Sequence, residues 1–517
     1  MKRCLRYFSW LLGLCVIGVA LAVLLPLKSA PLVGVKGDYS LSHINIVNTI
    51  SGGISKDMTV LIAKGRIVEI LPSKQYQPRS NYFDIRAAGK YLIPGLWDMH
   101  THSLKLSPQL HHPLFLRYGV TSIRDMSGCL TEKDSYWACP EDRYLWQKQA
   151  LNGERISPRY PLQSSYQTNG GSEVPEGFPA FFRLSTRADA RKLVDFYVER
   201  DVDFIKIYTE LSADQYDNLV EYSKKNNIAL AGHKPLSISL THALDTGLES
   251  IEHGRLFMFE CFDGIESFRA LDDPISQYNA QFMREMMRNQ KGEDCAVLMA
   301  AMASSNTRWV PTLTTLRMSA MAKDPSFRQD PRLKYIPYII KKLLWEPDIR
   351  RASKKGVDQQ GRFVHADFYA AASAQVGRAH SIGVELLAGT DNIDTYVFSG
   401  SSLHDELAML VDAGLTPLEA LQTATINPAR FSELDHDFGS VEINKQADLL
   451  LLNANPLSDI RHTADIFGVM FAGQYFDQEA LETLDHFSVD MAQSLQVNVR
   501  FLYDILASPL MRTQLAD

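Results

Sequence analysis

Two histidines separated by one residue, His100 and His102, end the apolar run IPGLWDMHTH at positions 93–102. Alternate residues of a β-strand point to the same face, so the two imidazoles can hold one cation together. Four further residues that can bind or bridge metal ions also lie at or near the ends of short apolar runs: Lys206, His233, His253 and Asp391. Imidazole and carboxylate are ordinary ligands of zinc and related divalent ions. The six residues together predict a catalytic metal site.

Lys206 is an unusual member of this set, because an ammonium group has no lone pair and repels cations. One interpretation is a structural lysine that forms an ion pair inside the protein. The other is that its amine reacts with CO₂ to form a carbamate, whose two oxygens can bridge metal ions about 3.5–4 Å apart. The apolar neighbours in the segment DFIKIY at 203–208 favour the neutral amine that this reaction needs.

The middle of the chain alternates between strand and helix patterns. Eight strands are expected, at 92–98, 120–125, 155–161, 204–208, 229–233, 250–253, 309–313 and 384–390. This alternation predicts an α/β fold, a (β/α)₈ TIM barrel, with its largest insertions at 256–306 and 314–381. Active-site residues of such barrels lie at the carboxyl ends of the strands, where all six predicted ligands fall.

The two flanks of this middle segment are rich in strand patterns. Strands at 58–63 and 66–71 flank Lys64-Gly65, which predicts a hairpin, and further strands are expected at 439–441, 447–452 and 466–472. We therefore expect a small β-sandwich formed by residues 38–93 and 431–477 around a barrel at 94–430. Residues 478–517 predict a C-terminal amphipathic helix, which we expect to pack on the barrel rather than to mediate dimerisation.

The first 30 residues form a separate segment. Three basic residues precede an uncharged stretch at 7–27, whose 21 residues can cross a bilayer of about 30 Å. An uncleaved anchor in the inner membrane of a bacterium is expected, with the rest of the chain in the periplasm; the alternative is a cleaved signal peptide. The net charge of −7, without long charged runs, gives no indication of nucleic-acid binding.

Four cysteines lie outside the leader: Cys129, Cys139, Cys261 and Cys295. An even number in an exported protein permits disulfides. Their order in the chain suggests the pairs Cys129–Cys139 and Cys261–Cys295, one of three possible connectivities. The alternative is four buried free thiols.

Several segments resemble those of the amidohydrolase superfamily, closest to its imidazolonepropionase-related and Xaa-Pro or Xaa-Arg dipeptidase-like members. They lie at 94–102, 204–208, 232–233, 252–254, 388–391, 416–421, 424–429 and 447–449. The resemblance implies two divalent metal ions, for which zinc is suited. His100, His102 and Asp391 would hold the first ion, His233 and His253 the second, and a carbamate on Lys206 would bridge them. True imidazolonepropionases use one metal and lack this lysine, so Lys206 argues against that activity.

The implied reaction is hydrolysis of a C–N bond in a small molecule by a hydroxide that bridges the metals. Asp391 would take the hydroxide proton and pass it to the leaving amine. A dipeptide or an N-acyl amino acid is the expected substrate. A lactone or ester hydrolase on the same metals is one alternative, and a non-catalytic barrel protein that binds ligands in the cell envelope is the other. An oligomer is possible.

Four residues near the predicted ligands are candidates for contact with the substrate. Tyr208 shares the face of Lys206 and could donate a hydrogen bond to the substrate, or pack inside the barrel. His404, after the eighth strand, could orient a ligand or lie on a solvated helix face. Lys234 and Arg255 could each bind a carboxylate, or form salt bridges with neighbouring loops.

Overall fold

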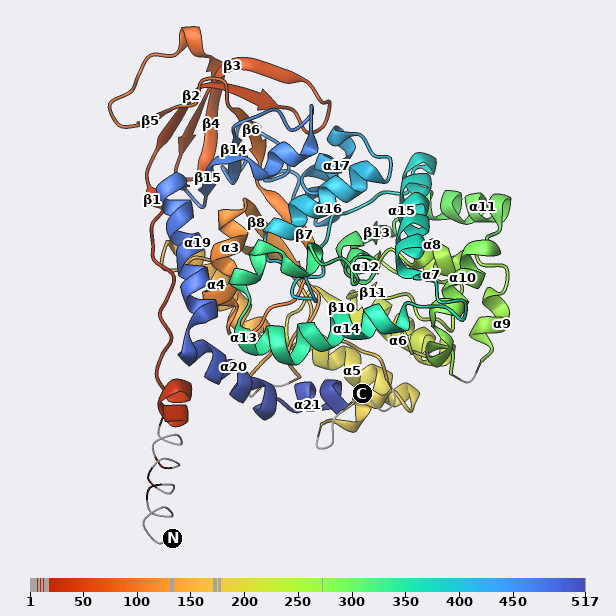
Figure 1. The fold of residues 1–517 in the computed structure, drawn as a ribbon. Helices are drawn as coiled ribbons and strands as arrows, with labels where there is room; N and C mark the ends of the chain where they lie inside the picture. The colour runs from red at the N-terminus through yellow and green to blue at the C-terminus, as the bar shows by residue number, and fades with distance from the viewer. Residues whose placement is uncertain are drawn as a thin grey trace.

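The computed structural model describes residues 7, 10, 13, 18–130, 134–170, 174, 178–271 and 273–516. It has a mixed α/β fold (Figure 1), in which a β-rich end formed by both flanks of the chain sits against the strands and helices of the middle segment.

The β-rich end is one sheet whose strands come from both flanks of the chain. Its nine strands are β1 (Val35–Lys36), β2 (Tyr39–Val47), β3 (Ile54–Ala63), β4 (Arg66–Pro72), β5 (Phe83–Arg86), β6 (Tyr91–Pro94), β14 (Leu449–Leu452), β15 (Ile466–Phe471) and β16 (Gln474–Phe476). The strand order is β1-β16-β15-β14-β6-β2-β3-β4, with β5 paired to β2. The two flanks meet where β14, from the C-terminal flank, pairs antiparallel with β6, from the N-terminal flank.

The predicted hairpin of this sheet is present between β3 and β4, which pair antiparallel. Its two turn residues, Lys64 and Gly65, have φ values of 50° and 74°. A two-residue turn with positive φ at both positions matches the twist of the flanking strands, which is why Gly is favoured there.

The middle segment contains two parallel sheets in which strand order follows chain order. The first is β7 (Leu96–Thr101), β8 (Val120–Asp125) and β9 (Arg159–Gln163); the second is β10 (Phe204–Ile207), β11 (Ala229–Gly232), β12 (Ser250–Glu252) and β13 (Arg308–Val310). A parallel bridge between Thr168 and Ile207 joins the two sheets.

Several expected strands differ from the structure. Residues 439–441 form no strand, and the strand expected at 309–313 is β13, Arg308–Val310. Residues 92–98 divide at Gly95 into β6, which pairs with β14, and β7, which pairs with β8 in another sheet. Glycine fits at this position, because a Cβ there would lie 2.1 Å from Thr121 Oγ1. The third strand starts four residues later than expected. Residues 384–390 do not form a regular strand: Leu386 bridges Trp309 and Asn392 bridges Thr101, each as an isolated parallel bridge.

The helices surround these strands. They are α2 (Ser107–Leu110), α3 (His112–Arg117), α4 (Pro140–Asn152), α5 (Arg187–Glu199), α6 (Ala213–Asn226), α7 (Leu240–Thr246), α8 (Leu256–Glu260), α9 (Ile265–Arg269), α10 (Ala280–Arg288), α11 (Gly292–Ala303), α12 (Leu313–Ala320), α13 (Tyr338–Ile340), α14 (Glu346–Lys355), α15 (His365–Ile382), α16 (Ser401–Asp412), α17 (Pro417–Thr423), α18 (Ile426–Phe431), α19 (Gln478–Gln493), α20 (Leu495–Ala507) and α21 (Pro509–Ala516). Capping boxes begin α5, α6 and α17, which places polar side chains on otherwise unpaired N–H groups.

We expected one helix in the C-terminal segment, but the structure has three: α19, α20 and α21. The break falls at Ser494, whose hydroxyl accepts a hydrogen bond from Val497 N–H and thereby caps α20. A serine that caps a new helix competes with continuation of the old one. The apolar side chains of α20, including Val497 and Phe501, are buried in a cluster that also contains Leu104 and Leu110.

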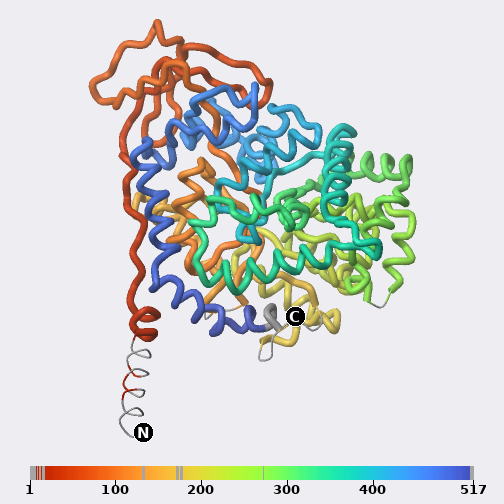
Figure 2. Tube along the Cα trace, in the orientation of Figure 1, coloured from red at the N-terminus to blue at the C-terminus, as the bar shows by residue number. Residues whose placement is uncertain are grey.

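The N-terminal segment descends beside α19 toward α20 (Figure 2). Gln496 donates a hydrogen bond to the Leu25 carbonyl and Arg500 donates one to the Val23 carbonyl. Within the described part of the chain, no helix is long and apolar enough to cross a membrane. Positions 8, 9, 11, 12 and 14–17 of the predicted anchor lie outside the described residues.

Both suggested disulfides are present. Cys129 is bonded to Cys139, and Cys261 to Cys295. The second bond joins the end of α8 to α11, so it ties together the insertion that follows β12.

Candidate active site

The structure brings the six predicted ligands to one edge of the parallel sheets. His100 lies in β7 and Lys206 in β10, while His102, His233 and His253 follow the ends of β7, β11 and β12. Asp391 comes from the segment that bridges β13 and β7. Because the carboxyl ends of parallel strands meet at one edge, residues more than 200 positions apart in sequence become neighbours.

Asp391 is the carboxylate at the centre of the group. Its Oδ1 lies 2.7 Å from His102 Nε2 and 3.3 Å from His100 Nε2, and its Oδ2 lies 3.7 Å from His253 Nδ1. Ligand atoms of His100, His253 and Asp391 all lie within 4.8 Å of one another, a group that could hold a metal ion. Burial disfavours the charged carboxylate, but the three histidines outweigh it and hold the pKa of Asp391 well below its ordinary value.

His233 and His253 form a second pair of imidazoles. Their Nε2 atoms lie 2.8 Å apart, while their Nδ1 atoms lie 2.9 Å from Thr209 Oγ1 and 2.8 Å from Thr312 Oγ1. With the proton on each Nδ1 and donated to the threonine, both Nε2 lone pairs face the same space, where the two rings could hold a cation together. Burial lowers the pKa of His253 to about 3, so its ring is neutral as a ligand requires.

Lys206 is almost completely buried, at 2% exposure, and its Nζ lies 3.4 Å from His100 Nε2. Burial lowers its pKa to about 8, although Glu252 and Asp391 oppose the shift. A lysine with this pKa has a larger neutral fraction near neutral pH than an ordinary lysine, and the neutral amine is the form that reacts with CO₂. These surroundings are compatible with the predicted carbamate.

Glu252 is part of the site and was not among the predicted site residues. Its Oε2 accepts a hydrogen bond of 2.8 Å from His100 Nδ1, and its Oε1 accepts from Ser250 and Arg124. Burial alone would raise the pKa of Glu252. Arg124 and His100 outweigh burial and lower the pKa to about 2. A carboxylate behind a metal-binding histidine fixes the ring and its tautomer. The signal in the sequence was a charged residue inside a short apolar strand, directly before His253.

Asp98 is a second carboxyl group that lies behind the ligands. It is fully buried, and its carboxylate accepts hydrogen bonds from the Thr390 hydroxyl at 2.6 Å and from the Thr390 N–H at 2.9 Å. It therefore fastens the segment before Asp391 to β7, two residues from His100. Burial raises its pKa to about 7.

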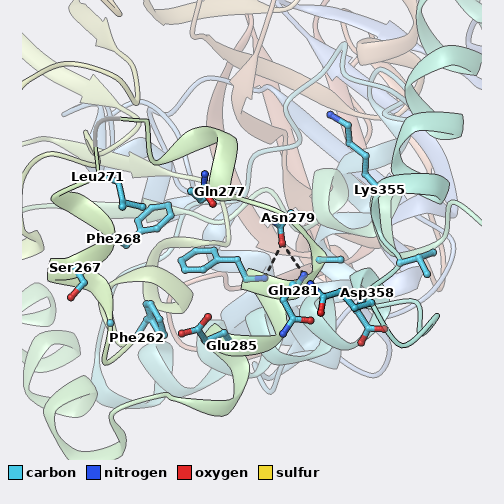
Figure 3. A pocket seen from close by; sticks show the side chains of 15 residues that line it. Phe262, Ser267, Phe268, Leu271, Gln277, Asn279, Gln281, Glu285, Lys355 and Asp358 are labelled. Atoms are coloured by element: carbon cyan, nitrogen blue, oxygen red, sulfur yellow. Dashed lines mark hydrogen bonds between the residues drawn. The ribbon is translucent and has the colours of Figure 1, made fainter.

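A cavity of about 270 Å³ adjoins the histidine pair. His233, His253 and Tyr208 are part of its wall, and the Tyr208 ring lies over His233 with centroids 4.0 Å apart. Tyr208 therefore lies beside the predicted ligands, and its contact with the substrate stays a prediction. A larger cavity of about 730 Å³, shown in Figure 3, is lined by none of the six ligands and lies around Asn279, which caps α10.

His404 has partners on both ring nitrogens. Its Nδ1 lies 2.9 Å from Thr463 Oγ1 and its Nε2 lies 2.9 Å from the Tyr118 carbonyl. The ring is buried in α16 and is not part of the wall of the cavity beside His233. These contacts suit a structural residue, and a role of His404 in substrate binding stays a prediction.

Comparisons with known proteins fit this geometry. Residues 366–475 match the model of the Amidohydrolase family. No curated protein matches the chain in sequence. Among solved structures, a bottromycin amidohydrolase is 21% identical with a TM-score of 0.66, and the match covers 88% of this chain and 90% of that one.

Two further solved structures are similar in fold. A putative prolidase from Bifidobacterium longum is 23% identical with a TM-score of 0.58, covering 88% of this chain and 99% of that one. A Xaa-Pro dipeptidase with bound methionine is 17% identical with a TM-score of 0.58, covering 85% and 100%. At these identities, the likeness is one of fold.

Proposed function

We propose that this chain is a binuclear metal-dependent amidohydrolase that hydrolyses a C–N bond. The match of residues 366–475 to the Amidohydrolase family and the fold shared with solved structures support this proposal. Its substrate is a small amide, either a dipeptide or an N-acyl amino acid. The observation that carries the proposal is the convergence of Asp391 with His100, His102 and His253 beside a buried lysine.

The scaffold of this proposal is a closed (β/α)₈ barrel. Three isolated parallel bridges would complete it: Thr168 with Ile207, Trp309 with Leu386, and Asn392 with Thr101. Backbone hydrogen bonds from Leu387 to Trp309 and from Met99 to Ala388 connect the same segments. In this arrangement residues 384–390 supply the eighth strand.

The donor set fits two divalent ions. His100, His102 and Asp391 would hold one ion, His233 and His253 would hold the other, and carboxylated Lys206 would bind both. The buried Nδ1 of His102, which has no hydrogen-bond partner among the described residues, is a further nitrogen available there. Bound ions would lower the pKa of a water molecule and polarise the substrate carbonyl. Zinc suits this mixture of nitrogen and oxygen donors.

Proton transfer is assigned to Asp391. Its low pKa keeps it ionised and able to accept a proton, and its Oδ2 has longer contacts to the histidines than Oδ1 has. Oδ2 would accept a proton from the attacking water and deliver it to the nitrogen of the leaving amine, as general base and then general acid. Glu252 would hold the His100 ring throughout.

Two solved structures of similar fold, described as a prolidase and as a Xaa-Pro dipeptidase, support a dipeptide as substrate. The volume of the cavity beside His233, about 270 Å³, also suits a molecule of this size. The test is turnover of a panel of dipeptides and N-acyl amino acids by protein loaded with zinc, with lactones and esters run in parallel. Turnover of amides that is lost on chelation supports the proposal, and turnover of lactones alone contradicts it.

We also propose that the chain functions in the bacterial periplasm. The two disulfides support this proposal, because such bonds persist in oxidising compartments. Fractionation of cells after alkylation of free thiols tests it. Protein in the periplasm with all four of these cysteines protected is expected, and cytoplasmic protein with reactive thiols would contradict it.

A further inference from the structure

Arg255 is a cation of the cavity beside His233 and His253 that has no ion-pair partner among the described residues. It lies two residues after His253, at the start of α8, and is exposed. Its guanidinium carbon lies 5.5 Å from the centre of the Tyr278 ring, which holds the side chain against the cavity wall. Its positive charge is also a minor contribution to the lowered pKa of His253, after burial, His100 and Lys206.

Lys234 is the other cation of this cavity, and its charge is already compensated. Its Nζ donates hydrogen bonds to the carbonyls of Pro235 and Ile238, at 2.8 and 2.6 Å, and lies 3.1 Å from Glu260 Oε1. Its three N–H groups are therefore occupied. Glu260 in turn also pairs with Arg269 at 2.7 Å. The sequence could not distinguish Lys234 from Arg255 as the residue that binds a carboxylate. The structure does, because Lys234 is already paired and Arg255, within the described part of the chain, is not.

A second cavity, of about 450 Å³, shares Arg255 and Tyr278 with the first. Arg351 and Lys355 line it, with Asp348 as its single carboxylate. No ion pair of Asp348 with these cations occurs among the described residues. The region around Arg255 therefore carries an excess of positive charge in a chain whose net charge is −7, which favours an anionic ligand.

The wall beside His233 also has an apolar part, while the two glutamates that line the cavity, Glu252 and Glu260, are each paired with a cation. The apolar part includes Leu236, Phe259, Phe268 and Ile275. A ligand that satisfies both parts of this cavity has one anionic group and one apolar side chain. The Tyr278 hydroxyl, which has no hydrogen-bond partner among the described residues, is a second donor, and burial raises the pKa of Tyr278 so that it keeps its proton.

We propose that Arg255 binds the carboxylate of the substrate, with Tyr278 as a second donor, so that the substrate is an N-acylated apolar amino acid or a dipeptide that ends in one. Arginine suits this role because its planar fork donates two parallel hydrogen bonds to a carboxylate. The inference rests on the proposed function for the position of the scissile bond, but the binding of the carboxylate does not require turnover.

The first experiment measures binding of leucine and leucinol to the full chain by calorimetric titration. The two ligands differ in that leucinol lacks the carboxylate, and neither has a bond that the enzyme would cleave. We expect the native protein to bind leucine more tightly than leucinol, and Arg255→Met to weaken leucine binding about 10- to 100-fold while leucinol binding stays the same. Arg255→Lys should retain part of the preference.

Arg288→Met is the matched control, because Arg288 is exposed on α10 and lines none of the described cavities. It removes the same charge and should keep the leucine preference. Equal binding of leucine and leucinol by the native protein, or a preference that survives in Arg255→Met, would overturn the inference.

The second experiment separates this inference from the proposed function. With N-acetyl-leucine as substrate, Arg255→Met should raise KM more than it lowers kcat. An Arg255-dependent leucine preference in a protein that hydrolyses no amide would uphold the carboxylate site and reject the proposed function. Hydrolysis of N-acetyl-leucine with unchanged KM in Arg255→Met would uphold the proposed function and reject the carboxylate site.

Discussion

Glu252 Oε2 accepts a hydrogen bond of 2.8 Å from His100 Nδ1, and this contact directs His100 Nε2 toward Asp391 and Lys206. Partners of this kind behind a metal-binding histidine typically contribute 10–100-fold to metal affinity. The orientation of the His100 ring therefore depends on Glu252. Among the described hydrogen bonds, His100 is the only predicted ligand that Glu252 contacts.

Glu252→Gln is expected to lower metal affinity by about 10–100-fold, because the neutral amide is a weaker acceptor for His100. It also leaves the buried Arg124 without its carboxylate, so the melting temperature should fall. Competition with a chromogenic chelator measures the affinity. Glu249→Gln, three residues earlier and without a side-chain hydrogen bond among the described residues, is the control; equal affinities in both variants would contradict the role of Glu252.

Asp391→Asn is expected to abolish turnover, by about 100- to 10,000-fold, while the protein still binds metal, more weakly. The amide cannot accept the proton from the attacking water. Initial rates on a cleaved dipeptide and elemental analysis of the same sample provide the measurement. Asp394→Asn is the comparison variant. Burial and then Asp391 raise the pKa of Asp394 to about 7, so much of the charge of this carboxyl group is already absent. Retained activity in Asp391→Asn would remove its assigned role.

Lys206→Ala is expected to lower the metal content, because the bridging carbamate cannot form. Addition of a short carboxylic acid such as acetate or propionate should restore metal and some activity, since the acid can occupy the space that the lysine left. Lys445→Ala removes another buried lysine, which donates a hydrogen bond to Ser440 in the β-rich end, and should keep full metal content. Full metal content in Lys206→Ala would contradict the carbamate.

Removal of the Cys261–Cys295 bond by a double alanine substitution is expected to lower the free energy of unfolding. The bond closes a loop with a sequence separation of 34, which corresponds to about 3–4 kcal/mol in the chain-entropy description. The bond Cys129–Cys139, with a separation of 10, should contribute less, about 2–3 kcal/mol. Urea denaturation of the oxidised chain and both double variants compares them; an unchanged midpoint in both would contradict this stabilisation.

Much of the site was predictable because the information is local. His100 and His102 sit two residues apart on one strand, and each remaining ligand follows its own apolar run, so strand periodicity alone places them at one edge. The hairpin at Lys64-Gly65 and the pairing of the four cysteines are also short-range features.

The parts that were missed depend on long-range contacts. Glu252 becomes a site residue only when β12 brings it within 2.8 Å of His100 in β7. The expected eighth strand is replaced by isolated bridges that depend on Trp309 and Thr101, which are distant in sequence. Lys234 and Arg255 look equivalent in sequence, and only the position of Glu260 on α8 shows that one of them is paired.

The most direct test of the binuclear site is the metal content of the chain, measured by elemental analysis on protein without its leader segment after dialysis. The account predicts about two divalent ions per chain, and loss of hydrolysis when they are removed. One ion per chain would contradict the bridging role of Lys206. No bound ion, even after supplementation with zinc, would contradict the proposed metallohydrolase itself.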